Sequence, residues 1–341
     1  MVARLVETGY RAQKTAHALF AGAFMRIFHQ LVKRDLTLPS ATERKALQRR
    51  FEALIAEDLA NVKAGHYPEK VLFQTGFKDV LRALPDGLLE LPRVIARARK
   101  NRYDELPPEA QSDRFPRYYR RTFHWQTDGW FSAQSARFYD PGVDLLFGGT
   151  ADVMRRMIVP DIKRHLADQP APKVLDLATG TGRFLGQLAL ARPDARFTGL
   201  DLSAPYLKFA GQALSHVAEL SLVADNAETL PFADQTFDAV TCVFLFHELP
   251  SDARRNVVAE ALRVLKPGGL FAVLDSAQLD TASDVAFFLE SFPKIYHEPY
   301  YKGYLRDPLP ALFAEQGFEV LSDRDHFVSR AVIARRPVPA A

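Results

Sequence analysis

The 341-residue sequence has a single cysteine and no long apolar run, and both shortages narrow the class of protein. Cys242 alone cannot form an internal disulfide or a thiolate metal cage, so stability must come from burying apolar side chains. The longest nearly apolar run, residues 239–246, is far shorter than the roughly 20 residues that span a bilayer. The first residues show no signal-peptide pattern. The sequence therefore predicts a globular, cytoplasmic protein.

Familiar catalytic patterns are missing as well. The nine histidines show no paired spacing with carboxylates that is typical of zinc or iron, so no metal site is predicted. The sequence contains neither a Gly-x-x-x-x-Gly-Lys-Ser/Thr phosphate loop nor a Gly-x-Ser-x-Gly nucleophile elbow. These absences remove the common nucleotide-hydrolysing and serine-hydrolase classes.

Charge is distributed unevenly along the chain, although the net charge is only +3. Residues 1–120 hold 22 Lys and Arg against 14 Asp and Glu, whereas residues 121–341 hold 22 against 27. A basic segment can meet nucleic acid, an anionic membrane surface or the acidic half of its own chain. Charge alone does not choose among these three partners.

The first hundred residues have a helical pattern. Apolar residues recur every three or four positions between Ala16 and Val32, which predicts a long amphipathic helix. Its polar edge carries Arg11, Lys14, Arg26, Lys33 and Arg34. Such a helix, taken as residues 10–35, either packs in the protein or lies on a membrane surface. A second helix is predicted from Ser40, which has Glu43 in capping-box position, to Leu59.

The remaining chain divides into two further parts. We place a boundary within the proline-containing residues 106–115, and residues 116–165 are dense in aromatic side chains that fill a core or line a ligand pocket. From residue 166 onward the pattern alternates. Strands are predicted at residues 173–177, 196–200, 220–223, 237–246 and 269–275, separated by helices at 183–191, 204–217 and 252–264. This alternation predicts an α/β domain with a parallel sheet and helices on both faces.

A glycine turn after the first of these strands is the most informative segment, with the sequence VLDLATGTG at residues 174–182. A nicotinamide dinucleotide site would have Gly-x-Gly-x-x-Gly spacing, but Gly180 and Gly182 are followed by Gly186, one residue too late. Asp176, just before the turn, offers a carboxylate to a positively charged amino group. The pattern therefore favours a cationic, amino-acid-like ligand.

Polar residues at the next two strand ends extend this interpretation. Asp201 ends the second strand, where a carboxylate can accept both ribose hydroxyls. Asp225, Asn226 and Ala227 follow the third strand, where they can contact an adenine edge. An Asp at a strand end is more often only a cap or turn residue, but the three positions in this order together predict S-adenosylmethionine.

Three motifs resemble those of a known family. They are DLATGTG at residues 176–182, NAETLPFADQTFD at 226–238 and LKPGG at 265–269. This series is similar to that of class I S-adenosylmethionine-dependent methyltransferases, and most similar to the ubiquinone/menaquinone-biosynthesis C-methyltransferases. FYD at residues 138–140, LFGG at 146–149 and RR at 155–156 extend the resemblance upstream. The resemblance covers about residues 135–320 and leaves residues 1–115 outside.

The resemblance implies a Rossmann-like fold with a seven-stranded, mostly parallel sheet and helices on both faces. Residues 1–115 would be a helical extension or lid, residues 116–165 a substrate-covering segment, and residues 166–341 the S-adenosylmethionine-binding domain. The expected cofactor-binding residues are Asp176, Ala178, Thr179, Gly180, Gly182, Asp201, Leu202, Asp225, Asn226, Ala227 and Phe244.

One departure from the family affects the acceptor. Where the quinone family tends to carry Arg-Asn after the fourth strand, this chain has His247-Glu248. The departure puts a quinone acceptor in doubt and supplies two candidate catalytic residues. His247 could take a proton from a phenol-like acceptor, with Glu248 orienting the ring or acting as the base itself. The alternative is that His247 is a structural residue and Glu248 faces solvent.

Aromatic residues outside the motifs are candidates for the substrate pocket, with core packing as the alternative for each. They are Tyr139, Tyr296, Tyr300 and His124. The predicted acceptor is a small aromatic or lipid-like molecule. A non-catalytic binding protein and an RNA methyltransferase using the basic first half remain alternatives. DNA is disfavoured because the tetrad associated with methylation of exocyclic amines and a second cysteine are both missing.

Overall fold

A seven-stranded sheet with the order β3-β2-β1-β4-β5-β7-β6 forms the centre of the protein. The computed structural model describes residues 2–32, 39–74 and 77–339, with side chains for all of these except residues 2–4, 77–84 and 86. Neighbouring strands from β3 through β5 pair in parallel, whereas β7 is antiparallel to β5 and β6. The strands are β1 Lys173–Leu177, β2 Arg196–Asp201, β3 Leu220–Ala224, β4 Phe237–Val243, β5 Leu265–Ser276, β6 Glu319–His326 and β7 Ser329–Arg335. The predicted fold class is confirmed.

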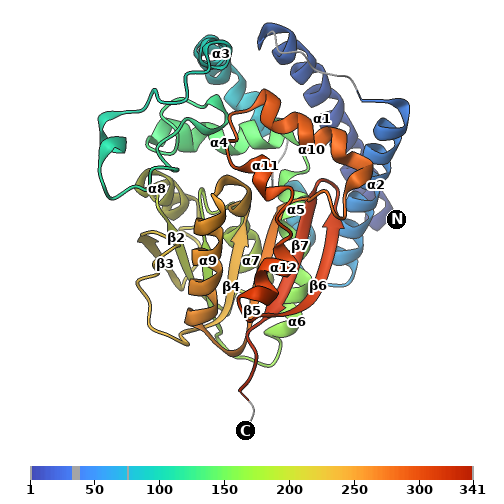
Figure 1. Ribbon diagram of the computed structural model, residues 1–341. Helices are drawn as coiled ribbons and strands as arrows, with labels where there is room; N and C mark the ends of the chain where they lie inside the picture. The colour runs from blue at the N-terminus through green and yellow to red at the C-terminus, as the bar shows by residue number, and fades with distance from the viewer. Residues whose placement is uncertain (1, 33–38, 75–76, 340–341) are drawn as a thin grey trace.

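Helices cover both faces of the sheet and one of its ends. They are α1 Val2–Val32, α2 Ala41–Lys63, α3 Phe77–Lys100, α4 Ala133–Leu146, α5 Ala151–Arg155, α6 Val159–His165, α7 Arg183–Ala191, α8 Ala204–Ala213, α9 Ser251–Val264, α10 Ala286–Ile295, α11 Tyr301–Tyr304 and α12 Leu309–Glu315. Figure 1 shows α1, α3, α4 and α10 above the sheet, beyond the ends toward which the parallel strands run.

Two apolar cores follow from the alternation of side chains along each strand. On β1, Val174 belongs to one core with α7 residue Leu185, whereas Leu175 belongs to the other with α9 residue Val257. The first helix contributes to both cores, since Tyr10 lies in the first and Phe28 in the second. The proposed three-part division of the chain stays a prediction, but the extension packs directly onto the sheet domain.

The buried face of α1 differs from the predicted one. Lys14, expected on the polar edge, is only 2% exposed, and its Nζ donates to the Gly149 carbonyl oxygen at 2.6 Å. Leu19 and Ile27, expected in the core, are 71% and 58% exposed. The helix turns this side toward the loop after α4, because the loop supplies the Gly149 carbonyl oxygen that Lys14 needs. The loop also packs closely, with Gly149 against the ring of His17. Lys33 and Arg34 lie outside the described residues.

The fourth strand ends three residues earlier than predicted. β4 stops at Val243 because Phe244 has a φ of 58°, which an extended strand cannot accommodate. A short 3-10 turn, η5 (Phe246–Glu248), follows directly. His247 and Glu248 therefore lie in a tight turn at the end of the sheet.

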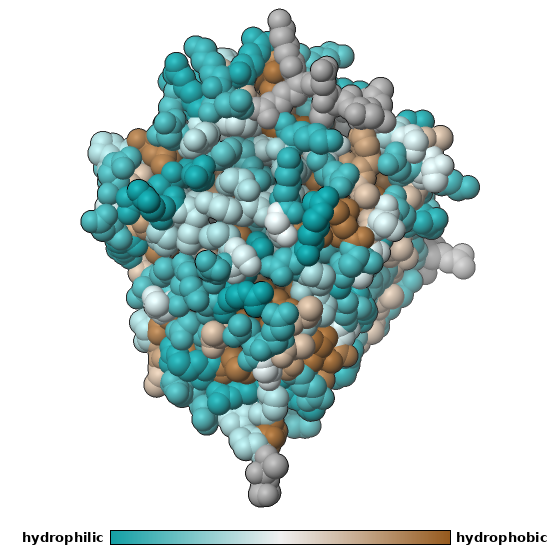
Figure 2. Space-filling model, viewed as in Figure 1, coloured by the Kyte–Doolittle hydropathy of each residue, from teal (hydrophilic) through white to brown (hydrophobic). Residues whose placement is uncertain are grey.

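The lengths of the helices and one face of the surface bear on whether a segment could span a membrane. Within the described ranges, no helix combines the length and apolar character that crossing a bilayer requires. On the face seen in Figure 2, hydrophilic residues predominate and hydrophobic residues form small separate patches.

Candidate active site

A cleft with an empty volume of about 1080 Å³ lies at the carboxyl ends of β1, β2 and β4. Ligands of open α/β sheets bind at this end. Ten of the predicted cofactor residues line it, namely Asp176, Ala178, Thr179, Gly180, Asp201, Leu202, Asp225, Asn226, Ala227 and Phe244. The structure thus brings together residues from four successive strand ends.

The glycine turn is held in a conformation that few residues adopt. Ala178, Gly180 and Gly182 have φ values of 55°, 57° and 82°. A Cβ on Gly182 would lie 2.7 Å from Leu214, so this glycine serves close packing of the turn against the segment after α8 and does not line the cleft. The turn exposes backbone to the cleft while the helix α7 starts directly behind it.

Asp176 is a buried carboxylate at the end of β1. It is 3% exposed, and its Oδ1 accepts a hydrogen bond from Thr241 Oγ1 at 2.7 Å. Burial raises the pKa of Asp176 to about 7, although the hydroxyl groups of Thr241 and Thr179 act in the opposite direction. A positively charged ligand in the cleft would relieve this cost.

Asp201 links the ends of β1 and β2. Its Oδ2 accepts from the Gly180 amide and its Oδ1 from the Ser203 amide, both at 2.8 Å. Burial raises the pKa of Asp201 to about 6 in spite of these two bonds. The carboxylate is therefore fixed in position in the cleft, where remaining lone pairs can accept ribose hydroxyls. A buried and a half-buried carboxylate beside an open glycine turn fit a cationic nucleoside such as S-adenosylmethionine.

An aromatic wall covers the cleft, and sequence reasoning found only part of it. Tyr118, Tyr119, Phe123, Trp130, Tyr139 and Tyr206 line the cleft. Tyr118 donates to Glu228 Oε1 at 2.6 Å, and Arg114 donates to the Ala224 carbonyl oxygen at 2.6 Å. These two bonds hold the segment before α4 over the end of β3. The density of aromatic residues was visible in the sequence, but its partners at β3 were not.

The two predicted catalytic residues have different surroundings. Glu248 lines the cleft, whereas His247 lies behind it and lines a smaller neighbouring cavity. His247 Nδ1 lies 2.6 Å from Asp275 Oδ1, and its Nε2 lies 3.8 Å from Glu248 Oε1. Burial lowers the pKa of His247, but the carboxylates of Asp275, Glu248 and Glu298 together outweigh burial and raise the pKa to about 9. An imidazole that already carries a proton is a poor base. Burial and the Glu298 carboxylate also raise the pKa of Glu248 above its ordinary value, so position decides between the two, and only Glu248 lines the cleft.

A second, apolar cavity adjoins the cofactor cleft. It has an empty volume of about 1280 Å³ and lies between α1, α3 and α4, with Phe24, Phe28, Leu91 and Val94 in its wall. Tyr139 lines this cavity, the cofactor cleft and also the smaller cavity that His247 lines. Two further predicted pocket residues, His124 and Tyr296, line the apolar cavity.

Tyr300 does not line any of the described cavities. Its ring instead packs against Tyr118 at a centroid distance of 6.3 Å, beside the aromatic wall. For Tyr300 the structure therefore favours a role in packing over a role in the substrate pocket.

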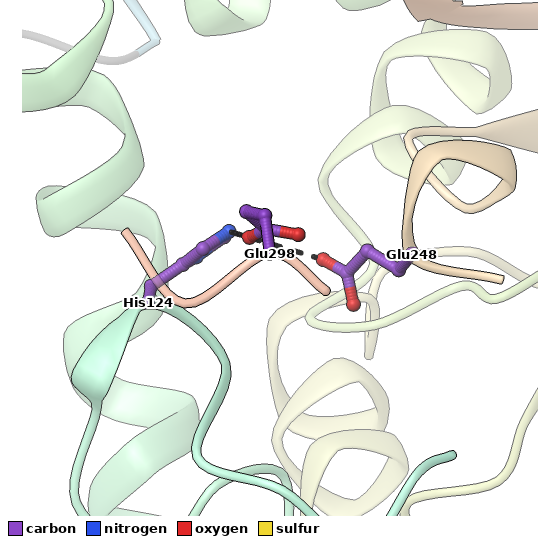
Figure 3. A group of neighbouring side chains, drawn as sticks. All are labelled: His124, Glu248 and Glu298. Carbon is purple, nitrogen blue, oxygen red and sulfur yellow. Dashed lines mark ion pairs between the residues drawn. The ribbon is translucent and has the colours of Figure 1, made fainter. Parts of the chain in front are cut away.

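Glu298 is the functional candidate that sequence reasoning missed. It lies between α10 and α11, is 4% exposed, and approaches His124 and Glu248. Figure 3 shows the His124 ring and the Glu248 carboxyl group converging on Glu298 from opposite sides. The three residues come from separate segments, so their spacing in the sequence carries no signal. The prediction that the chain has no metal site rested on such spacing alone.

The fold and the cleft define a doubly wound α/β domain built to hold a cationic nucleoside. Residues 174–269 match the family model described as a methyltransferase domain. This part of the chain is thus similar to methyltransferase domains, and the predicted resemblance to class I S-adenosylmethionine-dependent methyltransferases is confirmed. S-adenosylmethionine is the cofactor of that class, as predicted.

Curated relatives share this domain. A ubiquinone/menaquinone biosynthesis C-methyltransferase from Desulfotalea psychrophila is 37% identical over 152 residues, 40% of this chain and 58% of the relative. A demethylmenaquinone methyltransferase from Lysinibacillus sphaericus is 35% identical over 119 residues, 35% of this chain and 50% of the relative. The chain thus spans about half the length of the curated relatives it matches.

Among solved structures, an S-adenosylmethionine-dependent methyltransferase from Aquifex aeolicus matches with a TM-score of 0.44 and 17% sequence identity. The match covers 60% of this chain and 99% of the Aquifex chain.

Proposed function

We propose that this protein transfers the methyl group of S-adenosylmethionine to a small acceptor that has an apolar or aromatic body and one ionisable hydroxyl or acidic carbon. The observation that carries the proposal is the junction at Tyr139, where the cofactor cleft with its two carboxylates meets the apolar cavity between α1, α3 and α4. An acceptor body in the apolar cavity would place its reactive end at the cleft. The curated relatives named for quinone-type products fit such an acceptor.

The chain's own residues would bind and orient the two reactants. Bound S-adenosylmethionine supplies an electrophilic methyl group on a positively charged sulfur. Asp176 would hold the amino group, Asp201 the ribose hydroxyls, and the residues after β3 the adenine. The aromatic wall would exclude water, and positioning for in-line attack supplies a large part of the rate. We assign removal of the acceptor's proton to the Glu248 carboxylate, which lines the cleft.

The test is release of S-adenosylhomocysteine in the presence of a panel of phenols, hydroquinones and hydroxylated lipids. We expect turnover with at least one apolar phenol and a loss of roughly 10²–10⁴-fold in kcat for Glu248→Gln, the range for general-base assistance. The exposed Glu290→Gln, on the neighbouring helix α10, serves as the matched control and should keep full activity. Binding of S-adenosylmethionine without turnover on any acceptor would favour a non-catalytic binding protein.

Contact with a membrane surface remains a second proposal, because the acceptor class includes lipids. The outer side of α1 exposes Leu5, Leu19 and Ile27 together with Arg11 and Arg26. Exposed apolar residues beside basic ones are typical of helices that lie on anionic membranes. The same helix lines the apolar cavity with Phe24, Met25 and Phe28. A lipid-like acceptor would then reach the cavity from the surface that α1 contacts.

A further inference from the structure

We propose that His124, Glu248 and Glu298 bind one divalent first-row transition-metal cation at the boundary between the cofactor cleft and the apolar cavity. The inference deepens the proposed function, on which its catalytic meaning rests. Each residue offers one ligand atom, and these atoms all lie within 4.8 Å of one another. A single cation can therefore reach an imidazole nitrogen and two carboxylate oxygens without a large movement of the backbone.

The three ligands are held by the scaffold. His124 lies in the 3-10 turn η3 (Phe123–Trp125) with a φ of 52°, a left-handed backbone conformation that non-glycine residues adopt uncommonly. The adjacent Trp125 is 2% exposed and donates from Nε1 to the Ile295 carbonyl oxygen at 2.8 Å. This bond ties the turn of His124 to the segment that carries Glu298. Glu248 is fixed by η5 at the end of the sheet.

An independent observation points to a missing partner at this position. Neither Oε1 nor Oε2 of the buried Glu298 makes a hydrogen bond, and the same holds for Nε2 of His124. Glu298 Oε1 and His124 Nε2 form an ion-pair contact, but without the direction of a hydrogen bond. A carboxylate this deeply buried is costly unless it is fully paired. A cation between the two groups would satisfy both sets of lone pairs.

The charge balance also fits a cation. His247 Nε2 lies 3.8 Å from Glu248 Oε1, but this imidazole already pairs with the Asp275 carboxylate at 2.6 Å. That leaves the imidazole of His124, 4.0 Å from Glu248 Oε1, to face the carboxylates of both Glu248 and Glu298. Even a protonated His124 would neutralise only one of them, whereas a divalent cation matches both. Imidazole suits iron, zinc and nickel, and carboxylates suit manganese and magnesium, so the mixed set favours a cation such as Mn²⁺, Fe²⁺ or Zn²⁺.

The location gives the site a role in the reaction. Glu248 lines the cofactor cleft, and His124 lines the apolar cavity. Three protein ligands leave coordination positions open, as in catalytic metal sites. A hydroxyl oxygen of the acceptor can fill one of them and lose its proton to the second, uncoordinated carboxylate oxygen of Glu248, because a bound cation lowers the pKa of a coordinated hydroxyl. The acceptor then forms its bond to the methyl carbon as the bond from that carbon to the cofactor sulfur breaks, and the sulfur keeps the electron pair.

Calorimetric titration with Mn²⁺ alone tests the site on the full-length, metal-stripped protein. We expect one saturable site per chain, and a loss of at least about tenfold in affinity for Glu298→Gln, since even residues behind a metal ligand cost this much. His124→Asn should give a similar loss. Glu290→Gln, an exposed carboxylate on α10, should bind Mn²⁺ as the unmodified protein does.

A test of folding keeps the result interpretable. Each variant is titrated with S-adenosylhomocysteine, because His124 and Glu298 do not line the cofactor cleft and a folded variant should keep that affinity. Absence of a saturable site, or equal Mn²⁺ affinity in both ligand variants and the unmodified protein, would overturn the metal site and leave the proposed methyl transfer standing. Failure to bind S-adenosylhomocysteine, with Mn²⁺ binding intact, would contradict the proposed function instead.

Discussion

At the scale of single residues, buried charge decides how the cofactor cleft works. Asp176 and Asp201 both reside in the cleft with pKa values raised by burial. Neither faces an Arg or Lys within hydrogen-bond reach among the described residues. A positively charged ligand is therefore the partner that both carboxylates lack.

We expect Asp201→Asn to weaken binding of S-adenosylhomocysteine. A hydrogen bond to a charged group contributes about 1.5–3 kcal/mol, which corresponds to a loss of affinity of roughly ten- to a hundredfold. Isothermal titration calorimetry measures the loss, and the exposed Asp168→Asn is the matched control. Unchanged affinity in Asp201→Asn would show that the assigned geometry of the ribose is wrong.

Binding of the cationic cofactor should depend on pH. Because the pKa of Asp176 is raised to about 7 and that of Asp201 to about 6, both are protonated at acidic pH and ionised above pH 7. S-adenosylmethionine affinity should therefore fall as pH decreases from 8 to 5.5, by up to about tenfold per pH unit for each proton taken up. Titrations at several pH values check this, and Asp176→Asn should flatten the upper part of the profile. A flat profile in the unmodified protein would contradict the assignment.

In the protein without ligand, a rise in pH has the opposite effect: the ionisation of Asp176 lowers the free energy of unfolding. The folded-state pKa of Asp176 lies above the roughly 3.9 of an unfolded Asp. The folded state thus binds the proton more tightly, and this group disfavours folding as pH rises from about 4 to about 7. Cofactor should accordingly raise the melting temperature more at pH 8 than at pH 5.5.

At the scale of elements, a buried ion pair joins the N-terminal helices to the sheet domain. Arg156, 1% exposed, donates through Nε to Asp58 Oδ1 at 2.6 Å and through a second nitrogen to Oδ2. Tyr10 from α1 and Tyr67 also donate to Asp58. Three segments of the first seventy residues are thereby tied to the helical stretch that precedes β1.

Arg156→Met should reduce the free energy of unfolding by about 3–5 kcal/mol, because it leaves Asp58 as an uncompensated buried charge. Urea unfolding of the protein without ligand measures the change. Arg164→Met is the comparison: the Arg164 side chain is 66% exposed and pairs with Asp161, so the cost should be about 0–1 kcal/mol. Similar costs for the two variants would contradict the structural importance of the buried pair.

At the scale of the whole molecule, basic residues of the first half of the chain form ion pairs with acidic residues of the second half. Arg50 from α2 donates to Asp284 at 2.6 Å and to Asp325 at 3.4 Å, and Arg49 also reaches Asp284. Part of the basic first half therefore meets the acidic second half of the same protein. Exposed basic residues remain along α1, where the apolar side chains also face outward.

Contact with a membrane would involve the whole exposed side of α1. We expect the protein to co-sediment with anionic phosphatidylglycerol vesicles, and the double variant Leu19→Gln with Ile27→Gln to lose most of this binding, since both side chains are exposed. Neutral phosphatidylcholine vesicles provide the charge control. If the unmodified protein stays in the supernatant, α1 serves only the core and the apolar cavity.

The sequence by itself determined the sheet domain and the polar residues that line the cleft at the strand ends. Alternating strands and helices require a parallel sheet, and the polar residues that follow parallel strands must gather at one end of it. Asp176, Asp201 and Asp225 were predictable for that reason, since local order along the chain is enough to place them.

Only the tertiary structure decided which face of α1 is buried and which residues approach Glu248. Helical periodicity marks a broad apolar stripe, but the partner surface selects the side, and here the loop at Gly149 buries Lys14. His124, Glu248 and Glu298 lie 50 or more positions apart, so no local pattern relates them. Their convergence depends on the packing of three separate turns, and packing is a property of the folded chain as a whole.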